Sequence, residues 1–351
     1  MPDLYHTQRR LRRALRVHFP AADGRIVLRT ELDWNLDIEP VRVSADKTLH
    51  EFLIESDHPF LYFKACLRTG DNLIWANGAN ALLLLTTDDP RDAYPFFGVG
   101  KVVGTMTPTL EVPAPALGRT HKVRVYLPPG YGENPLKRFP VLYMQDGKNL
   151  FFPEEAFGSR EWQVDESLDL LDSMNAADKC IVVGIHSEDR MKDYTKPGYE
   201  VYGRSLVEDI KPFVDRTFRT LPERAETGVV GSSLGGVVSF YLGWHFHETF
   251  GFAACLSSTF AHRDDLMERV LDEPRRETRF YLDSGWPGDN YEVTLAMAMA
   301  LIERGYVQGR DVVHCAFPLA EHDEGAWGKR LHLPLQLFCG PVATASRGRF
   351  V

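Results

Sequence analysis

Gly228-Val229-Val230-Gly231-Ser232-Ser233-Leu234-Gly235-Gly236-Val237 is the stretch of sequence that decides the fold. Apolar residues precede and follow a short turn of glycine and serine, in which Ser233 is central. This order predicts a strand, a sharp turn and a helix, with the Ser233 hydroxyl at the apex of the turn. Gly231 and Gly235 suit such a turn because strand and helix approach so closely that a side chain there would collide. Ser232 is excluded as a nucleophile because only the middle position of the turn points outward. The alternative interpretation of the whole stretch is a glycine-rich turn that merely opens a buried helix.

The composition is that of an ordinary globular chain with room for two hydrophobic cores: 351 residues, 44% hydrophobic and 25% charged. A net charge of −9 argues against nucleic-acid binding, because contacts with phosphates need a clustered excess of Lys and Arg. No apolar segment approaches the length of a membrane span and no secretory signal is visible, so we expect a cytoplasmic protein without a membrane partner. The five cysteines are widely spaced without metal-ligand spacing, which is typical of reduced, buried thiols and predicts no metal site.

The chain divides near residues 113–118, where two prolines and a glycine punctuate the sequence. Residues 25–114 contain short, alternating, turn-separated apolar runs, which predict a small β-sandwich domain of immunoglobulin-like type. Residues 1–24 are interpreted as an N-terminal helical segment with a charged face, and residues 341–351 as a C-terminal tail. From 115 to 340 strands alternate with helices, which predicts an α/β domain: a mostly parallel sheet with helices on both faces.

The predicted strands of the second domain cover residues 123–127, 140–144, 180–185, 227–230, 252–256, 279–283 and 312–317. Helical periodicity is clearest at residues 205–218 and 291–304. Active sites of such sheets lie at the carboxyl ends of the strands, so candidate residues are sought there.

A serine nucleophile needs a base within hydrogen-bond reach and an acid that orients the base, in the chain order serine, acid, histidine. His322 fits the base, because it follows the predicted strand at 312–317 and lies in a short polar loop. His245, His247 and His314 fall within a predicted helix or strand and are poorly placed. A solvated loop histidine is the alternative interpretation of His322.

Two aspartates compete for the role of the acid. Asp283 ends a predicted strand, whereas Asp289 lies in the Gly- and Pro-rich loop that follows it and precedes the helix at 291–304. Asp289 is favoured because loops carry the triad acid in this kind of fold. Asp289 could instead be only a helix N-cap, and Glu292 is a weaker third candidate.

Acyl transfer also requires two amide donors for the developing oxyanion. The amide of Leu234, which follows the nucleophile, provides one. The second is predicted to be the amide of Lys148, because Gly147 lets the loop at 145–149 turn this amide toward the site.

Several segments closely resemble the esterase D and enterochelin esterase group of α/β-hydrolases, over roughly residues 115–340: 141–151, 162–166, 181–185 and 231–236. The resemblance implies an α/β-hydrolase fold and a Ser-acid-His triad without metal or organic cofactor. Ser233 matches the nucleophile, His322 the base, and the amides of Leu234 and Lys148 the oxyanion hole. Asp289 matches the acid less cleanly, because its loop is rearranged around residues 286–287.

Candidate pocket residues are Gly147, Trp162, Arg190 and Trp286. Arg190 lies in a loop that mixes cations and acids, so a solvated surface loop is the better interpretation. The tryptophans could line an aromatic cleft or simply pack in the core.

The leading hypothesis is therefore a serine carboxylic-ester hydrolase that acts on a small-molecule ester through an acyl-enzyme, either a siderophore-type lactone or an acyl or feruloyl ester. An acyltransferase of the same fold and a non-catalytic ligand-binding protein are the alternatives. The identity of the ester and the oligomeric state do not follow from the sequence.

Overall fold

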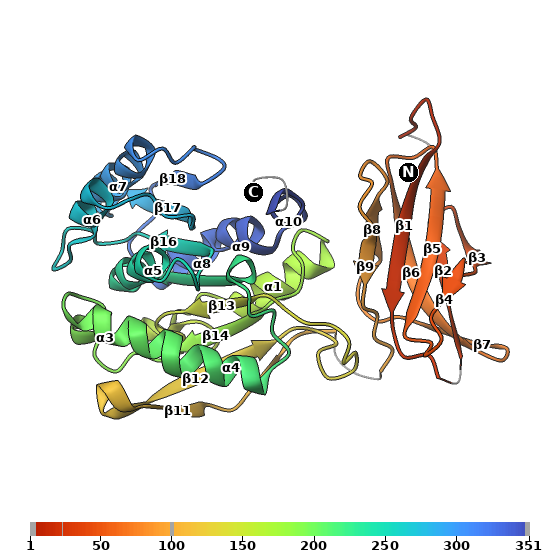
Figure 1. Cartoon of the computed structure of the whole chain (residues 1–351), viewed down its shortest axis with the longest axis horizontal. Coiled ribbons are helices and arrows are strands. Elements are labelled where there is room, and N and C mark those ends of the chain that lie inside the picture. Colours follow the sequence, from red (N-terminus) through yellow and green to blue (C-terminus); the bar gives the residue numbers. More distant parts are fainter. Residues whose placement is uncertain (1–4, 23, 99–101, 348–351) are drawn as a thin grey trace. The chain divides into compact units, whose positions relative to one another are not determined.

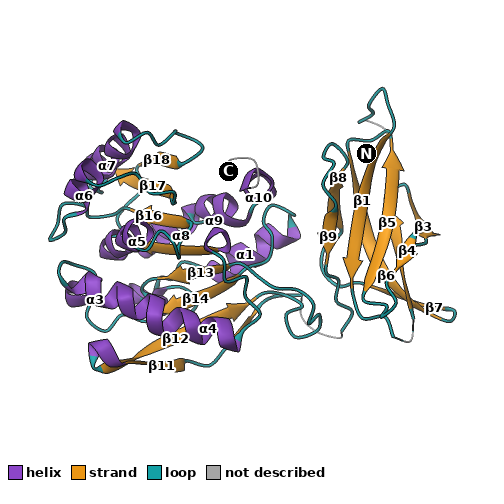
Figure 2. Ribbon diagram, in the orientation of Figure 1, coloured by secondary structure: helices purple, strands orange, loops and turns teal. Residues whose placement is uncertain are grey.

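The computed structural model describes residues 5–22, 24–98 and 102–347, which form two compact units (Figure 1). The N-terminal unit comprises Met1–Gly104 with Pro128–Lys137 and Asp172–Asn175. The C-terminal unit comprises Thr105–Leu127, Arg138–Leu171 and Ala176–Val351. Strands make up the N-terminal unit, whereas helices and strands alternate in the C-terminal unit (Figure 2).

The N-terminal unit contains two sheets. The first has the order β4 (Arg42–Val43), β5 (Leu49–Ser56), β1 (Leu11–His18), β9 (Arg91–Ala93). The second has the order β3 (Asp33–Ile38), β2 (Arg25–Thr30), β6 (Phe60–Thr69), β7 (Asn72–Trp75), with β8 (Ala81–Leu84) also paired to β6. Leu15 and Phe52 of the first sheet share one hydrophobic cluster with Ile26 and Leu61 of the second. Two sheets around a common core agree with the expected β-sandwich, and the immunoglobulin-like assignment stays a prediction.

The predicted helical segment at residues 1–24 is wrong where the structure describes it. Residues 11–18 form strand β1, which pairs along its whole length with β5 in antiparallel register. Leu15 and Val17 are buried two positions apart, which is the period of a strand. Pairing in the sheet buries these residues, and a short isolated helix would not bury them.

The C-terminal unit is built on one sheet with the strand order β10, β12, β14, β13, β15, β16, β17, β18. The bounds of these strands are β10 Thr105–Met106, β12 Arg119–Leu127, β13 Val141–Met144, β14 Ile181–Ile185, β15 Thr227–Ser232, β16 Phe252–Leu256, β17 Arg279–Trp286 and β18 Val312–Pro318. Strands β13 to β18 run parallel, and β12 is antiparallel to β14. The predicted strands therefore correspond to β12 through β18.

The boundary between the units lies earlier than the predicted residue 114. Strand β11 (Leu110–Ala114) pairs with β12 and so belongs to the sheet of the C-terminal unit. Pro113 lies inside β11, opposite Thr120 of β12, and proline is tolerated in a strand that has a neighbour on one side only. Residues 341–347 of the predicted tail form helix α10 (Pro341–Arg347).

The helices of the C-terminal unit are α1 (Val164–Ser173), α2 (Arg190–Asp193), α3 (Gly198–Ser205), α4 (Lys211–Thr217), α5 (Leu234–His245), α6 (Leu266–Asp272), α7 (Tyr291–Glu303), α8 (Glu324–Arg330), α9 (His332–Cys339) and α10. The predicted helix at 205–218 corresponds to α4 and a π-helical turn at Leu206–Ile210 that follows α3. No helix among the described residues is both long and apolar enough to cross a membrane.

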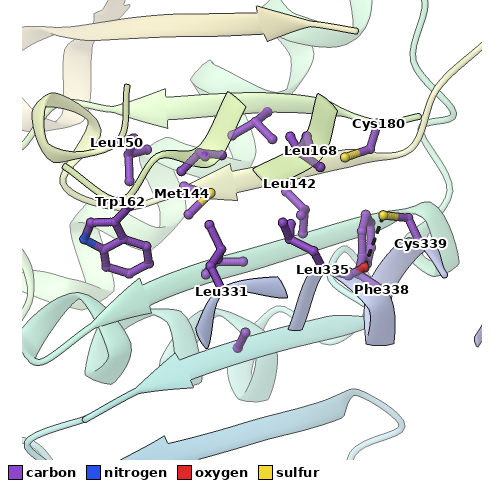
Figure 3. Packing of buried hydrophobic residues seen from close by; sticks show 14 of the residues in the cluster. Leu142, Met144, Leu150, Trp162, Leu168, Cys180, Leu331, Leu335, Phe338 and Cys339 are labelled. Carbon is purple, nitrogen blue, oxygen red and sulfur yellow. Dashed lines mark hydrogen bonds between the residues drawn. The ribbon is translucent and has the colours of Figure 1, made fainter. Parts of the chain in front are cut away.

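Alternate side chains of the strands bury opposite faces of this sheet. Leu142 and Met144 of β13 pack in one cluster with Leu168 of α1 and Leu335 of α9 (Figure 3). On the other face, the ring of Phe240 in α5 stacks on Phe280 of β17 at 4.6 Å between centroids. Helices therefore cover both faces, and the carboxyl ends of the parallel strands carry the polar loops that form the site.

Candidate functional site

Ser233 lies between β15 and α5 and has backbone angles of φ 55° and ψ −123°. A non-glycine residue adopts such angles only when its surroundings impose them, and this strain is typical of the nucleophile turn of a hydrolase. The amide of Ser233 donates to the carbonyl oxygen of Leu256 in β16 at 2.9 Å, which ties the turn to the neighbouring strand. The residue remains partly exposed, whereas Ser232 before it and Leu234 after it are buried.

Gly231 is required by the close approach of strand and helix. A Cβ atom added at this position would overlap the carbonyl oxygen of Gly235 in α5. We expect Gly231→Ala to lower the free energy of unfolding by about 2–4 kcal/mol, since the clash is with backbone that cannot rotate away. Chemical unfolding of the purified variant measures this change. Gly325→Ala is the matched control in the same unit, because a Cβ there meets only ordinary contacts; equal stability of the two variants would contradict the argument.

His322 lies in the loop between β18 and α8, where its Nδ1 is 2.7 Å from Oδ1 of Asp289. Its ring lies edge-on against Trp327, 5.0 Å between centroids. Because the carboxylate of Asp289 accepts a hydrogen bond, the contact places the imidazole proton on Nδ1 and leaves Nε2 free to face a substrate or Ser233. His322 and Ser233 do not form a hydrogen bond with each other in the described part of the chain. Such contacts in ligand-free sites are often long and tighten when substrate binds.

Asp289 has a fully buried side chain and accepts hydrogen bonds at both oxygens. Oδ1 accepts from His322 and from the amide of Asn290, and Oδ2 accepts from the amide of Gly285 at 2.6 Å and from Ser257 Oγ at 2.5 Å. Burial alone raises the pKa of Asp289, but these hydrogen bonds outweigh it and lower the pKa to about 2. The carboxylate is therefore ionised at neutral pH and can support an imidazolium on His322.

Asp283, the alternative acid, is engaged elsewhere. Its carboxylate accepts hydrogen bonds from Tyr281 at 2.8 Å and from Nε of Arg330 at 3.1 Å. Burial is the largest cause that raises the pKa of Asp283 to about 6, although Arg330 opposes it. The contact of His322 with Asp289 and the pairing of Asp283 with Arg330 support Asp289 as the acid. Glu292 is exposed on α7.

Ser257 is a site residue that sequence reasoning missed. It follows β16 with φ 45°, is fully buried, and its hydroxyl donates to Asp289. The same oxygen accepts from Trp327 Nε1 at 3.0 Å and from Arg330 Nη2 at 2.5 Å. The position directly after a central parallel strand could have pointed to Ser257, because active-site residues gather at such ends.

The two predicted oxyanion donors belong to helical elements, α5 and a 3₁₀ turn. Leu234 is the first residue of α5, so its amide has no acceptor within the helix. Lys148 is central in the 3₁₀ turn Gly147–Asn149, which follows Asp146 in a left-handed conformation with φ 55°. A Cβ at Gly147 would lie 2.6 Å from the backbone carbon of Gly184, so this loop can pass so close to β14 only with glycine.

Arg190 supports this loop from outside. Its Nε is 2.9 Å from Oδ1 of the buried Asp146, and about half of the Arg190 side chain is exposed. Burial is the largest cause that raises the pKa of Asp146 to about 6, against the opposing effect of Arg190. Arg190 therefore contacts the oxyanion loop through Asp146.

The two predicted pocket tryptophans lie in different environments. Trp162 is 1% exposed and belongs to the hydrophobic cluster between α1 and the sheet, where it packs against Trp327 at 5.8 Å between centroids (Figure 3). Trp162 is thus a core residue, because no part of its ring is available to a ligand in an open pocket. Trp286, at the end of β17, is 52% exposed.

Lys148 also lines a polar cavity of about 460 Å³ that the sequence did not indicate. The other lining residues are Thr109, Glu111, Lys122, Glu155 and His186. Burial is the largest cause that lowers the pKa of His186 to about 4, so this imidazole is neutral at neutral pH. The cavity offers charged and neutral hydrogen-bonding groups beside the loop that carries a predicted oxyanion donor.

Comparison with known proteins identifies one family and several distant relatives. The model of the Esterase family, described as "Putative esterase", matches residues 114–335. The uncharacterized protein YbbA of Bacillus subtilis is 24% identical over 154 residues, which cover 39% of this chain and 56% of YbbA. The endo-1,4-beta-xylanase/feruloyl esterase of Xylanibacter ruminicola is 28% identical over 152 residues, which cover 40% of this chain and 20% of that protein. The matched segments thus span about half of the first relative and a fifth of the second.

Several solved structures of esterases are similar to this chain in their fold. The enterobactin esterase FES of Shigella flexneri, solved with enterobactin, aligns with a TM-score of 0.55 and 14% identity over 91% of this chain and 90% of that chain. The ferulic acid esterase of Anaeromyces mucronatus, solved with ferulic acid, aligns with a TM-score of 0.55 and 17% identity over 68% of this chain and 92% of that chain. At such identities the likeness establishes the fold, which is of the α/β-hydrolase type.

Proposed function

Because this chain belongs to the Esterase family, we propose that it is a serine carboxylic-ester hydrolase with Ser233 as nucleophile, His322 as base and Asp289 as acid. The observation that carries the proposal is the strained turn at Ser233 together with the 2.7 Å contact between His322 Nδ1 and Asp289. The segment Leu256–Ser257 connects the nucleophile and the acid. The carbonyl oxygen of Leu256 accepts a hydrogen bond from the amide of Ser233, and the hydroxyl of Ser257 donates one to Asp289.

In the proposed reaction, Ser233 Oγ attacks the ester carbonyl carbon while Nε2 of His322 accepts the hydroxyl proton. The amides of Leu234 and Lys148 donate hydrogen bonds to the oxyanion of the tetrahedral intermediate. The carbon–oxygen bond to the alcohol then breaks, and the alcohol leaves with the proton from His322. Water, deprotonated by the same imidazole, hydrolyses the acyl-enzyme and releases the acid.

The proposed substrate is a small-molecule ester, with a feruloyl ester or a siderophore-type lactone as the first candidates. Support comes from the likeness to ferulic acid esterases and to an enterobactin esterase. The polar cavity beside Lys148 suits a substrate part that carries hydroxyl or ionic groups.

A fluorophosphonate probe tests the proposed mechanism. We expect one covalent adduct per chain, which mass spectrometry of the digested protein assigns to the peptide with Ser233. Failure of the folded protein to react would favour the alternative of a non-catalytic ligand-binding protein. Product analysis with and without an added alcohol separates hydrolysis from acyl transfer, because both reactions share the acyl-enzyme.

We expect Ser257→Ala to lower kcat by about 10- to 100-fold with little change in KM. The substitution removes the acceptor of Trp327 Nε1 and one of the acceptors of Arg330 Nη2, at about 1–3 kcal/mol, and frees Asp289 to move away from His322. Steady-state kinetics with a nitrophenyl ester separates kcat from KM.

Ser258→Ala is the matched control, since this neighbouring buried hydroxyl has no hydrogen-bond partner among the described residues. Ser257 would lose its role as a positioning residue if both variants kept the wild-type kcat, or if only thermal stability changed.

A further inference from the structure

His6, Asp57 and His58 form a cluster of potential metal ligands in the N-terminal unit. His6 precedes β1, whereas Asp57 and His58 lie in the turn between β5 and β6. His6 Nδ1 is 3.0 Å from Oδ2 of Asp57, and His58 Nε2 is 3.8 Å from Oδ1 of Asp57. One ligand atom from each residue lies within 4.8 Å of the other two.

Backbone contacts hold the two segments together around Asp57. The amide of Thr7 donates to the carbonyl oxygen of Asp57 at 2.6 Å, and Thr7 Oγ1 donates to the same oxygen at 2.8 Å. The amide of His58 donates to Ser56 Oγ at 3.1 Å, and the His58 residue is only 8% exposed. The histidine rings meet edge to face, 4.6 Å between centroids. The segments are therefore positioned before any ion binds, which reduces the ordering that binding requires.

The donor set selects a class of metal ion. Two imidazoles and one carboxylate suit divalent ions of the later first transition series, whereas Mg²⁺ and Ca²⁺ prefer oxygen ligands alone. Tetrahedral bonds of about 2.0–2.1 Å place neighbouring ligand atoms roughly 3.3 Å apart. One atom from each residue lies within 4.8 Å of the others, so side-chain rotations must bring the three atoms closer to reach this spacing.

We propose that His6, Asp57 and His58 bind one divalent transition-metal ion, with Zn²⁺ as the reference occupant and water completing its coordination. The ion joins the segment before β1 to the β5–β6 turn. The inference is independent of the proposed esterase function, since it concerns residues of the N-terminal unit and its test does not use catalysis.

Metal titration of the full-length chain tests the site. After treatment with a chelator and its removal, isothermal titration with Zn²⁺ is expected to give one site per chain. Co²⁺ is expected to give the visible absorption of a nitrogen- and oxygen-ligated ion. Mg²⁺ and Ca²⁺ are expected not to displace Co²⁺.

Single variants identify the ligands. We expect His6→Ala and His58→Ala each to weaken Zn²⁺ binding by at least about 100-fold, because even loss of an outer-shell partner costs 10–100-fold. His332→Ala, which removes an exposed histidine of the C-terminal unit, is the matched control and is expected to bind like wild type.

Circular dichroism checks that each variant is folded. If His58→Ala perturbs the β5–β6 turn, His6→Ala still tests the site, because His6 lies outside the strands and the turn. Absence of a Zn²⁺ site in the wild-type chain, or unchanged binding by a folded His6→Ala, His58→Ala double variant, would overturn the proposal.

Discussion

Ser233→Ala is expected to lower kcat/KM for a short-chain nitrophenyl ester by at least about 10⁴-fold, with the folded state intact. The loss is this large because the remaining groups, the amides of Leu234 and Lys148 among them, cannot supply a nucleophile. Initial rates of nitrophenol release, measured against the uncatalysed reaction, give the ratio. The substitution removes a single oxygen from a partly exposed residue, so we expect little change in thermal stability.

Ser232→Ala is the matched control for this experiment, since Ser232 is the preceding residue of the same turn and has a buried side chain. We expect it to retain activity within about tenfold, a change that corresponds to at most 1.4 kcal/mol. Hydrolysis by Ser233→Ala at the wild-type rate would remove the serine mechanism altogether, and with it the proposed function.

Asp289→Asn is expected to lower kcat by about 10³- to 10⁴-fold, because an amide at this position can stabilise the wrong tautomer of His322 and cannot balance an imidazolium. Asp283→Asn is expected to act mainly on stability. It removes the nearer of two carboxylates from the guanidinium of Arg330, which is 3% exposed and keeps Asp289 at 3.8 Å, at about 1–3 kcal/mol. Kinetics and chemical unfolding of the two variants under the same conditions separate the two roles.

The pair of aspartate variants discriminates between the candidate acids. A larger loss of kcat in Asp283→Asn than in Asp289→Asn, with both proteins folded, would move the role of the acid to Asp283. Equal small losses would indicate that neither carboxylate orients His322.

Local sequence patterns predicted the parts of the fold that depend on neighbouring residues. The strands from β12 to β18 and the turn at Ser233 follow from apolar runs and glycine positions, and the resemblance to esterases of this group is confirmed by the family match. The loop position after a parallel strand led to His322 and Asp289, which the structure brings to 2.7 Å. Their catalytic roles stay predictions until the variants are measured.

Features that depend on distant pairing were not predicted. Arginines around Leu15 and Val17 suggested a charged helix face, and only the partner strand β5 makes β1 a strand. Pro113 argues against a strand in the local sequence, and only the pairing with β12 shows that β11 is one. The burial of Trp162 depends on Trp327, which lies far along the chain. Ser257 and the cluster at His6 have no sequence motif, because their partners come from separate segments.

The buried pairing of Arg330 has a consequence for the charge balance of the proposed triad. Arg330 Nη2 is 3.0 Å from Asp283 Oδ1 and 3.8 Å from Asp289 Oδ2, and with pKa values of about 6 and about 2 both carboxylates are ionised at neutral pH. This enclosed group thus has one surplus negative charge while His322 is neutral. Transfer of the Ser233 proton to the imidazole would balance the charge of these side chains, while one negative charge develops on the substrate oxygen, where the amides of Leu234 and Lys148 are proposed to stabilise it. The net charge of the site is the same before and after this step, and the buried surplus on Arg330, Asp283 and Asp289 therefore favours the imidazolium on His322.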